Sequence, residues 1–221
     1  MDTFSFKGYK LAYIQQDMPN LNPVPHIGER TIEIPITRLY LSKMDKSKLV
    51  ELGAVLPWWQ IPEDRQKNAD RPVDDVGWPV IDIADQYSKS IRMDGCNYDY
   101  AGKHVLSIST IEHFGQQGAY GITENRPDKG IEILDKIMRE SDKFFITWGM
   151  GQNIKLDKYA QELYNNPDFP SSGRLEYDLF IMKQINPHNR WELLEVPDFT
   201  LGYNHPFQWA NGVIFITNVS L

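Results

Sequence analysis

The sequence contains almost no cysteine, which limits the kinds of site it can build. Cys96 is the single cysteine in 221 residues. One thiol forms no internal disulfide and cannot supply a zinc site made of several cysteines. The five histidines show no ligand spacing such as H-x-x-x-H. We therefore expect no metal centre, and a reducing cytoplasm is the simplest setting for this chain.

Long apolar runs and an excess of basic residues are also absent. No hydrophobic stretch approaches the ~20 residues that span a bilayer, so we expect no transmembrane helix. The opening MDTFSFKGYK does not have the basic and apolar regions of a secretory signal. The formal net charge of −7 argues against nucleic acid as a partner, because phosphate contacts need clustered Lys and Arg. We expect a small-molecule partner.

Several signatures of catalysis and cofactor binding are missing. The chain has no G-x-S-x-G elbow, no P-loop and no G-x-G-x-x-G turn. These absences argue against serine hydrolases, nucleotide phosphate chemistry and nicotinamide-linked oxidoreductases. The (D/N/S)-P-P-(Y/F) motif typical of adenine amino methylation is absent, and Cys96 does not follow a proline as in cytosine C5 methylation.

The hydrophobic pattern predicts an α/β protein. We expect an irregular segment over 1–28 and a single domain over 29–221. A helix is expected within 29–43, beginning near Pro35, because proline suits a first helical turn. Residues 54–77 are expected to be mostly loop, and 175–185 are ambiguous. Other helices are predicted over 129–141 and 155–166, and strands over 48–53, 78–83, 90–94, 103–109, 142–149, 190–196 and 212–219.

Short apolar strands that alternate with helices favour a mostly parallel sheet with helices on both faces. The two late strands have no strong helix between them, which indicates an antiparallel C-terminal edge. In such sheets ligands bind beyond the carboxyl ends of the strands. Three acids, Glu51, Asp82 and Asp94, lie at the ends of three successive predicted strands. These carboxylates would repel a pyrophosphate and would suit a ribose diol, an amine or a sulfonium.

The order of these pieces resembles that of class I S-adenosylmethionine-dependent methyltransferases, which have a Rossmann-like sheet. LVELGAV resembles the first motif of the family, PVIDI the second and MDG the third. HVLSISTIEHFG, the most specific piece, is similar to the segment around the fourth strand. ILDKIMRESDKFFITWGMG resembles the unit of a helix and the fifth strand. The resemblance covers roughly 29–196.

The resemblance implies a cofactor site and an activity. S-adenosylmethionine would be the cofactor, and the acceptor of its methyl group would be a small molecule or a glycan or lipid precursor, methylated on oxygen or nitrogen. A hydroxyl acceptor would need a general base. His113 is the first candidate for it, with His205 and Asp157 in reserve. The residues that would contact the cofactor are Glu51, Gly53, Ala54, Asp82, Asp94, Gly95, Ser107 and Ser109.

Each of these residues also has a structural interpretation. Asp82 is a possible helix N-cap, and Asp94 with Gly95 a possible turn. Three departures from the family pattern support a non-catalytic protein that kept the sheet and lost the cofactor. The first motif keeps one glycine, Gly53; Lys103 and His104 replace the acid before strand four; and Ser141 and Asp142 replace a glycine pair.

Overall fold

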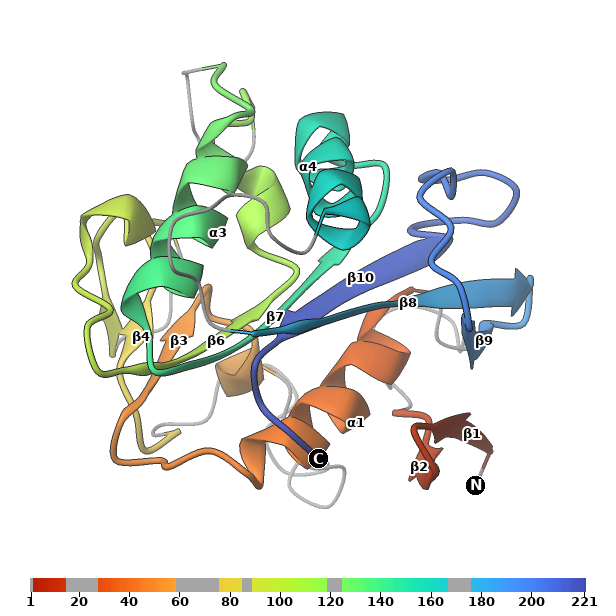
Figure 1. Ribbon diagram of the computed structural model, residues 1–221, viewed down its shortest axis with the longest axis horizontal. Helices are drawn as coiled ribbons and strands as arrows, with labels where there is room; N and C mark the ends of the chain where they lie inside the picture. The colour runs from red at the N-terminus through yellow and green to blue at the C-terminus, as the bar shows by residue number, and fades with distance from the viewer. Residues whose placement is uncertain (1, 15–27, 59–75, 85–88, 119–124, 167–175) are drawn as a thin grey trace.

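A computed structural model describes residues 2–14, 28–58, 76–84, 89–118, 125–166 and 176–221. It is an α/β protein built on one eight-stranded mixed sheet (Figure 1). The strands of this sheet are β3 (Leu49–Leu52), β4 (Val80–Ile81), β5 (Ser90–Ile91), β6 (His104–Ile108), β7 (Lys143–Gly149), β8 (Asp178–Asn186), β9 (Arg190–Leu193) and β10 (Gly212–Thr217). The longer helices are α1 (Arg30–Leu41), α3 (Lys129–Glu140) and α4 (Ile154–Asn165), and short 3-10 turns are η1 (Leu56–Trp58), η2 (Gly95–Asn97) and η3 (Ile111–His113).

The strand order is β5-β4-β3-β6-β7-β10-β8-β9, and the first five of these strands run parallel. Along the chain, β3, β4 and β5 are added in one direction, and β6 and β7 then continue on the other side of β3. The direction of winding therefore reverses between β3 and β6. In open α/β sheets such a reversal leaves a crevice beyond the carboxyl ends of the two strands, which is where ligands bind.

The antiparallel part of the sheet lies at the C-terminal end of the chain, as the sequence predicted, but its order differs from the chain order. The last strand, β10, inserts between β7 and β8 and pairs antiparallel with both. All six residues of β10 are buried, and β9 forms the outer edge. A continuous apolar strand such as GVIFIT suits this central position because both of its faces are covered. The ambiguous segment 175–185 contributes β8.

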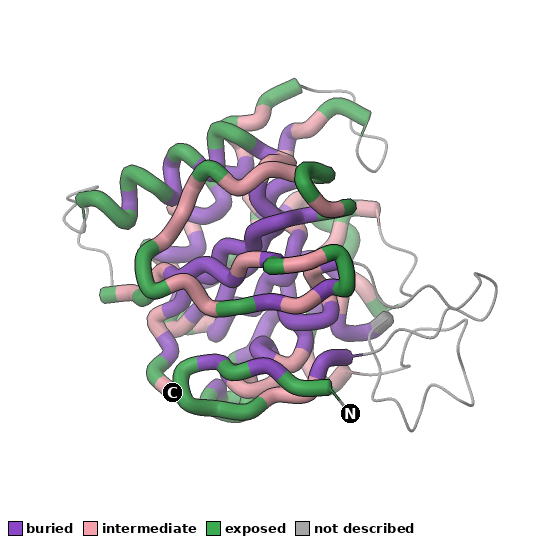
Figure 2. The backbone as a smooth tube through the Cα atoms, turned by 90° about the vertical axis from the view of Figure 1, so that its right-hand side faces the viewer, coloured by how far each residue is buried: buried purple, intermediate pink, exposed green. Residues whose placement is uncertain are grey.

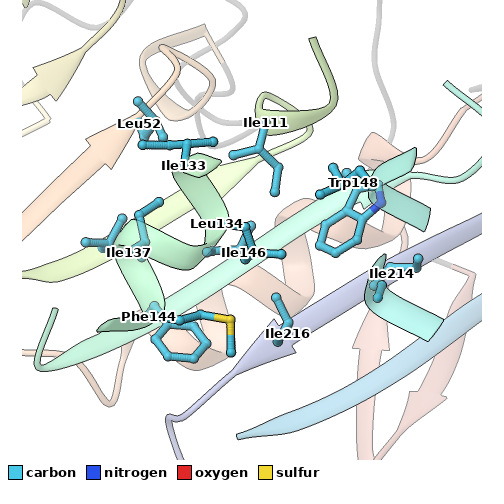
Figure 3. Close-up of a cluster of buried hydrophobic side chains, with 14 of the residues drawn as sticks. Leu52, Ile111, Ile133, Leu134, Ile137, Phe144, Ile146, Trp148, Ile214 and Ile216 are labelled. Carbon is cyan, nitrogen blue, oxygen red and sulfur yellow. The ribbon is translucent and has the colours of Figure 1, made fainter. Parts of the chain in front are cut away.

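Helices cover both faces of the sheet, as the sequence predicted (Figure 1). On one face, α3 and α4 pack over β3, β6, β7 and β10, with Ile133, Leu134 and Ile137 of α3 directed at the strands (Figure 3). On the other face, α1 packs on Leu106, Phe145 and Phe215 of the same strands. Buried residues accordingly gather in the strands, while the outer sides of the helices are exposed (Figure 2).

The predicted start of the first helix was wrong. Helix α1 begins at Arg30, so Pro35 lies inside it. Proline has no N–H to donate to the carbonyl four residues earlier, which is that of Thr31. That carbonyl accepts instead from the backbone N–H of Ile14, at 3.2 Å. The Thr31 hydroxyl in turn donates to the Ile14 carbonyl, at 2.9 Å. This contact from the N-terminal segment satisfies the group that Pro35 leaves without a partner.

The N-terminal segment was expected to be irregular, and this was wrong for its first part. Strands β1 (Thr3–Phe6) and β2 (Tyr9–Ala12) form an antiparallel hairpin. Phe4 and Phe6 are buried and join the core on the α1 side of the sheet. The short strands and their positive-φ turn at Lys7 and Gly8 carry a weak signal in the sequence. Residues 15–27 of the predicted irregular segment, and 59–75 of the predicted loop, lie outside the described residues.

Candidate functional site

Glu51, the first of the three strand-end acids, is fully buried at the end of β3. Its Oε1 accepts from the backbone N–H groups of Val55 and Leu56, at 2.9 and 2.7 Å. Its Oε2 accepts from the indole N–H of Trp78, at 3.2 Å. A buried carboxylate needs such donors to offset its lost hydration. Glu51 therefore fixes the conformation of the turn after β3, and its hydrogen bonds come from N–H groups of the protein itself.

Asp82 connects the ends of β3 and β4. One of its oxygens accepts from the backbone N–H of Ala54, at 3.0 Å, and the other from that of Ala84, at 2.8 Å. The side chain is only partly buried. Two bonds to backbone donors fix the plane of the carboxylate at the carboxyl edge of the sheet. Residues 85–88, where the helix of the N-cap alternative would begin, lie outside the described residues.

Asp94 follows β5 and begins η2. One oxygen accepts from the backbone N–H of Cys96, at 3.0 Å, and the other from the ammonium of Lys129 in α3, at 2.5 Å. Partial burial opposes ionisation, but the hydrogen bonds from Lys129 and Cys96 and the charge of Lys129 together outweigh it and lower the pKa of Asp94. The carboxylate thus stays charged at neutral pH. The next residue, Gly95, is packed tightly: an added Cβ would come within 2.6 Å of a methyl group of Leu52.

Gly53 has a positive φ of 82°, as a strand-end turn of this kind requires. The side of Gly53 where a Cβ would stand faces Thr110, two residues after the end of β6. A Cβ built on Gly53 would lie 2.0 Å from the Thr110 hydroxyl oxygen and 2.5 Å from its methyl carbon. The side chain of Thr110 therefore sits on the single glycine of the first motif, at the crevice between β3 and β6.

Ser107, inside β6, and Ser109, directly after it, have different surroundings. Ser107 is buried, and its hydroxyl has no hydrogen-bond partner within the described ranges. Ser109 has a positive φ of 37° and donates its hydroxyl to Glu33 of α1, at 2.7 Å. Ser109 thus fastens α1 to the end of β6. Its contacts place it beside a second group of charged side chains, at the ends of β6 and β7.

We call this second group the carboxyl cluster, and it consists of Glu29, Arg30, Glu33 and Glu112. Glu33 is fully buried and well satisfied. It accepts from Ser109, from the Thr147 hydroxyl at 2.5 Å, and from the Arg30 guanidinium at 2.5 Å. These bonds tie the first turn of α1 to both β6 and β7. The Arg30 side chain is 25% exposed, so the ion pair lies at the boundary with solvent.

Glu112, in η3, contrasts with Glu33. It is also fully buried, yet neither of its carboxyl oxygens has a hydrogen-bond partner among the residues that the structure describes. Burial raises its pKa well above the ordinary value, the backbone N–H of Glu112 itself and the charge of Arg30 oppose this, and Glu33 and Glu29 add to it. Burial likewise raises the pKa of Glu29, which is only partly exposed. Burial therefore favours the neutral form of the Glu112 carboxyl, which lies beside one cation and two further acids.

Two aromatic residues with polar groups border the carboxyl cluster. Burial raises the pKa of Tyr203, with further contributions from Glu29 and Glu112. His113 neighbours Arg30, and burial together with that charge lowers the pKa of its imidazole. His113 is therefore neutral at pH 7. Both side chains are partly exposed, so the group is reached from solvent on this side.

The two reserve candidates for the general base lie elsewhere. Asp157, in the first turn of α4, accepts from the indole N–H of Trp148 at 3.0 Å and from the N–H of Gly151 at 2.8 Å. Burial raises its pKa, against the effect of the Gly151 hydrogen bond. These contacts fit a structural role that joins α4 to the end of β7. His205 is exposed, in the loop that precedes β10.

The sequence analysis missed three charged residues of the carboxyl cluster, Glu29, Arg30 and Glu33. Glu33 carried a usable signal. It shares the helical positions i, i+3, i+4 and i+7 with Ile36, Thr37 and Tyr40, all of which are buried. An acid on the apolar face of a helix needs donors from elsewhere in the fold. The sequence alone does not name those donors.

Comparisons with known proteins add no identity to this geometry. No family model matches the chain, and no curated protein or solved structure matches it either. Across the described ranges, no group of three or more His, Cys, Asp and Glu side chains is arranged to hold a metal ion. None of the helices that the structure describes is long and apolar enough to cross a membrane.

Proposed function

We propose that the chain binds S-adenosylmethionine at the carboxyl edge of its parallel strands and transfers the methyl group to a small-molecule acceptor. The observation that carries the proposal is the sheet itself. Its five parallel strands reverse their winding between β3 and β6, and oriented acids stand at the ends of β4 and β5. This is where a nucleoside is held in sheets of this order. The motifs from LVELG to SISTIEH follow the same strand ends.

The donor chemistry of these strand ends fits an adenosyl group. Asp82 would accept hydrogen bonds from the ribose hydroxyls, in an orientation that Ala54 and Ala84 already fix. Asp94 would accept from the adenine amino group while Lys129 keeps it ionised. Carboxylates suit a ligand that brings hydroxyls, amines and a positive charge. When bound, the cofactor supplies an electrophilic methyl group on a sulfonium, and alignment of the acceptor with it accounts for much of the rate.

A second candidate is a protein of this fold that does not bind the cofactor. One observation favours it: the Thr110 side chain occupies the open side of Gly53, where the methionine part of the cofactor would approach the backbone. Glu51 is also fully engaged by backbone and indole donors. The two candidates differ in one measurable quantity, which is affinity for the cofactor.

The test is calorimetric titration with S-adenosylhomocysteine, with NAD as a ligand control. The methyltransferase proposal expects binding to the wild type, loss of binding in Asp82→Ala and weakened binding in Asp82→Asn. Asp99→Asn is the matched control, because Asp99 also caps a backbone N–H, that of Ala101, but lies in the loop before β6. No binding to a wild-type protein whose circular dichroism shows it to be folded would refute the proposal and favour the second candidate.

A further inference from the structure

We propose that the carboxyl cluster is a binding site for a small primary amine, which enters as its ammonium ion and is held by Glu112 with Glu29. No part of the adenosyl site argued above includes these residues. The binding itself does not depend on the proposed methyl transfer. Only the identification of the amine as the methyl acceptor rests on that proposed function.

The first argument is that two buried carboxyl groups, those of Glu33 and Glu112, differ in the hydrogen bonds they accept. Glu33 receives hydrogen bonds from Ser109, Thr147 and Arg30, whereas both oxygens of Glu112 lack a partner in the described part of the chain. A buried acceptor without a donor costs roughly 1–3 kcal/mol. Glu33 is thus held by three donors from other residues, and Glu112 by none that the described chain shows, so the Glu112 oxygens are free to accept from a donor outside the protein.

The second argument is charge. The elements that pack around Glu112 contribute Glu29, Arg30 and Glu33 from α1 and its start, and Tyr203 from the loop before β10. His113, next in η3, is neutral because burial and Arg30 lower its pKa. Arg30 is the counter-charge for Glu29, Glu33 and Glu112 alike, so three carboxyl groups share one cation. A cationic donor therefore suits the site better than an alcohol or an anion.

The third argument is access. Glu33 and Glu112 are buried, while Glu29, Arg30, His113 and Tyr203 are all partly exposed. The buried carboxyl groups thus form the inner end of the group, and the partly exposed residues form its border with solvent. The site also lies at the ends of β6 and β7, next to the crevice between β3 and β6, since Thr110 and Glu112 are two residues apart. An amine at Glu112 would be a neighbour of anything bound at that crevice.

The proton balance of this binding is explicit. The neutral Glu112 carboxyl loses its proton to solvent as the ammonium arrives, and the resulting carboxylate accepts hydrogen bonds from the ammonium N–H groups. If the amine is the methyl acceptor, the same carboxylate then takes one proton from the ammonium nitrogen, which leaves the lone pair needed for attack. Glu112 would then be the general base that the sequence assigned to His113.

The experiment is calorimetry on the full chain, without cofactor, with ethanolamine and tyramine as probes. Ethylene glycol and tyrosol replace their amines by hydroxyls and serve as ligand controls. Each titration is repeated in two buffers with different ionisation enthalpies, so that proton release is measured directly. We expect both amines to bind with release of protons, Glu112→Gln to lose most of this release, and Glu29→Gln to weaken binding. Glu132→Gln, in an exposed pair with Arg126, is the matched control and should change neither quantity.

The outcomes are decisive in both directions. Failure of both amines to bind, or binding without proton release, would overturn the proposal. So would equal binding of the alcohols, or proton release that persists in Glu112→Gln. The result is separate from that of the adenosyl site: amine binding with proton release but no affinity for S-adenosylhomocysteine would keep the amine site and discard methyl transfer.

Discussion

From the contact between Gly53 and Thr110 we predict how much stability the substitution Gly53→Ala costs at the crevice between β3 and β6. In Gly53→Ala, the new Cβ would lie 2.0 Å from the Thr110 hydroxyl oxygen and 2.7 Å from its Cβ, so Thr110 must move. Overpacking of this kind typically costs about 1–3 kcal/mol. The positive φ of 82° adds about 1 kcal/mol for an L-residue. We expect a total loss of about 2–4 kcal/mol in the free energy of unfolding.

The matched control is Gly102→Ala. Gly102 also has a positive φ, 69°, but an added Cβ would meet nothing within 4 Å. It should cost only the backbone contribution of about 1 kcal/mol. Urea denaturation followed by tryptophan fluorescence gives both values by linear extrapolation. In a double-mutant cycle, Thr110→Gly should cost less in the Gly53→Ala background than in the wild type, because it removes the three close atoms.

Two results would refute this reasoning. If Gly53→Ala cost no more than Gly102→Ala, the Thr110 side chain would not be packed on Gly53. If the cycle showed no coupling, the loss would come from the backbone alone. Either result would mean that the crevice is more open than the contact with Thr110 indicates, which removes the observation that favours the candidate without cofactor binding.

Two further predictions concern buried acids. Because the pKa of Glu112 is raised above its ordinary value of 4.5, the wild type should lose stability relative to Glu112→Gln by about 1.4 kcal/mol per pH unit as pH rises from that value towards the folded-state pKa. Urea denaturation at several pH values measures this slope, and parallel profiles of the two proteins would contradict it. Asp157→Ala leaves the buried indole N–H of Trp148 and the partly buried N–H of Gly151 without this acceptor and should cost about 2–4 kcal/mol. Asp157→Asn retains one acceptor oxygen and should cost less, so equal losses measured by the same denaturation would argue against these bonds.

Much of the fold was predictable because it depends on local patterns. The apolar runs of β6, β7 and β10 and the helical spacing of α3 identified those elements within a residue or two. The short hairpin and the start of α1 were not predictable in this way. A proline inside a helix is tolerated here because Ile14, which precedes Pro35 by 21 residues and lies outside α1, supplies the N–H donor that Pro35 lacks. That partner is a property of the tertiary contact and has no local pattern.

The candidate site shows the same division. The sequence by itself determined that acids stand at successive strand ends, since strand positions and residue identities are both local properties. Only the tertiary structure decided how each acid is used. It gave Glu51 and Asp82 backbone donors, gave Glu33 three side-chain donors, and left Glu112 with none in the described chain. The physical reason is that the pKa and the hydrogen bonds of a buried carboxyl group depend on groups distant in sequence, which only the packed fold brings into contact.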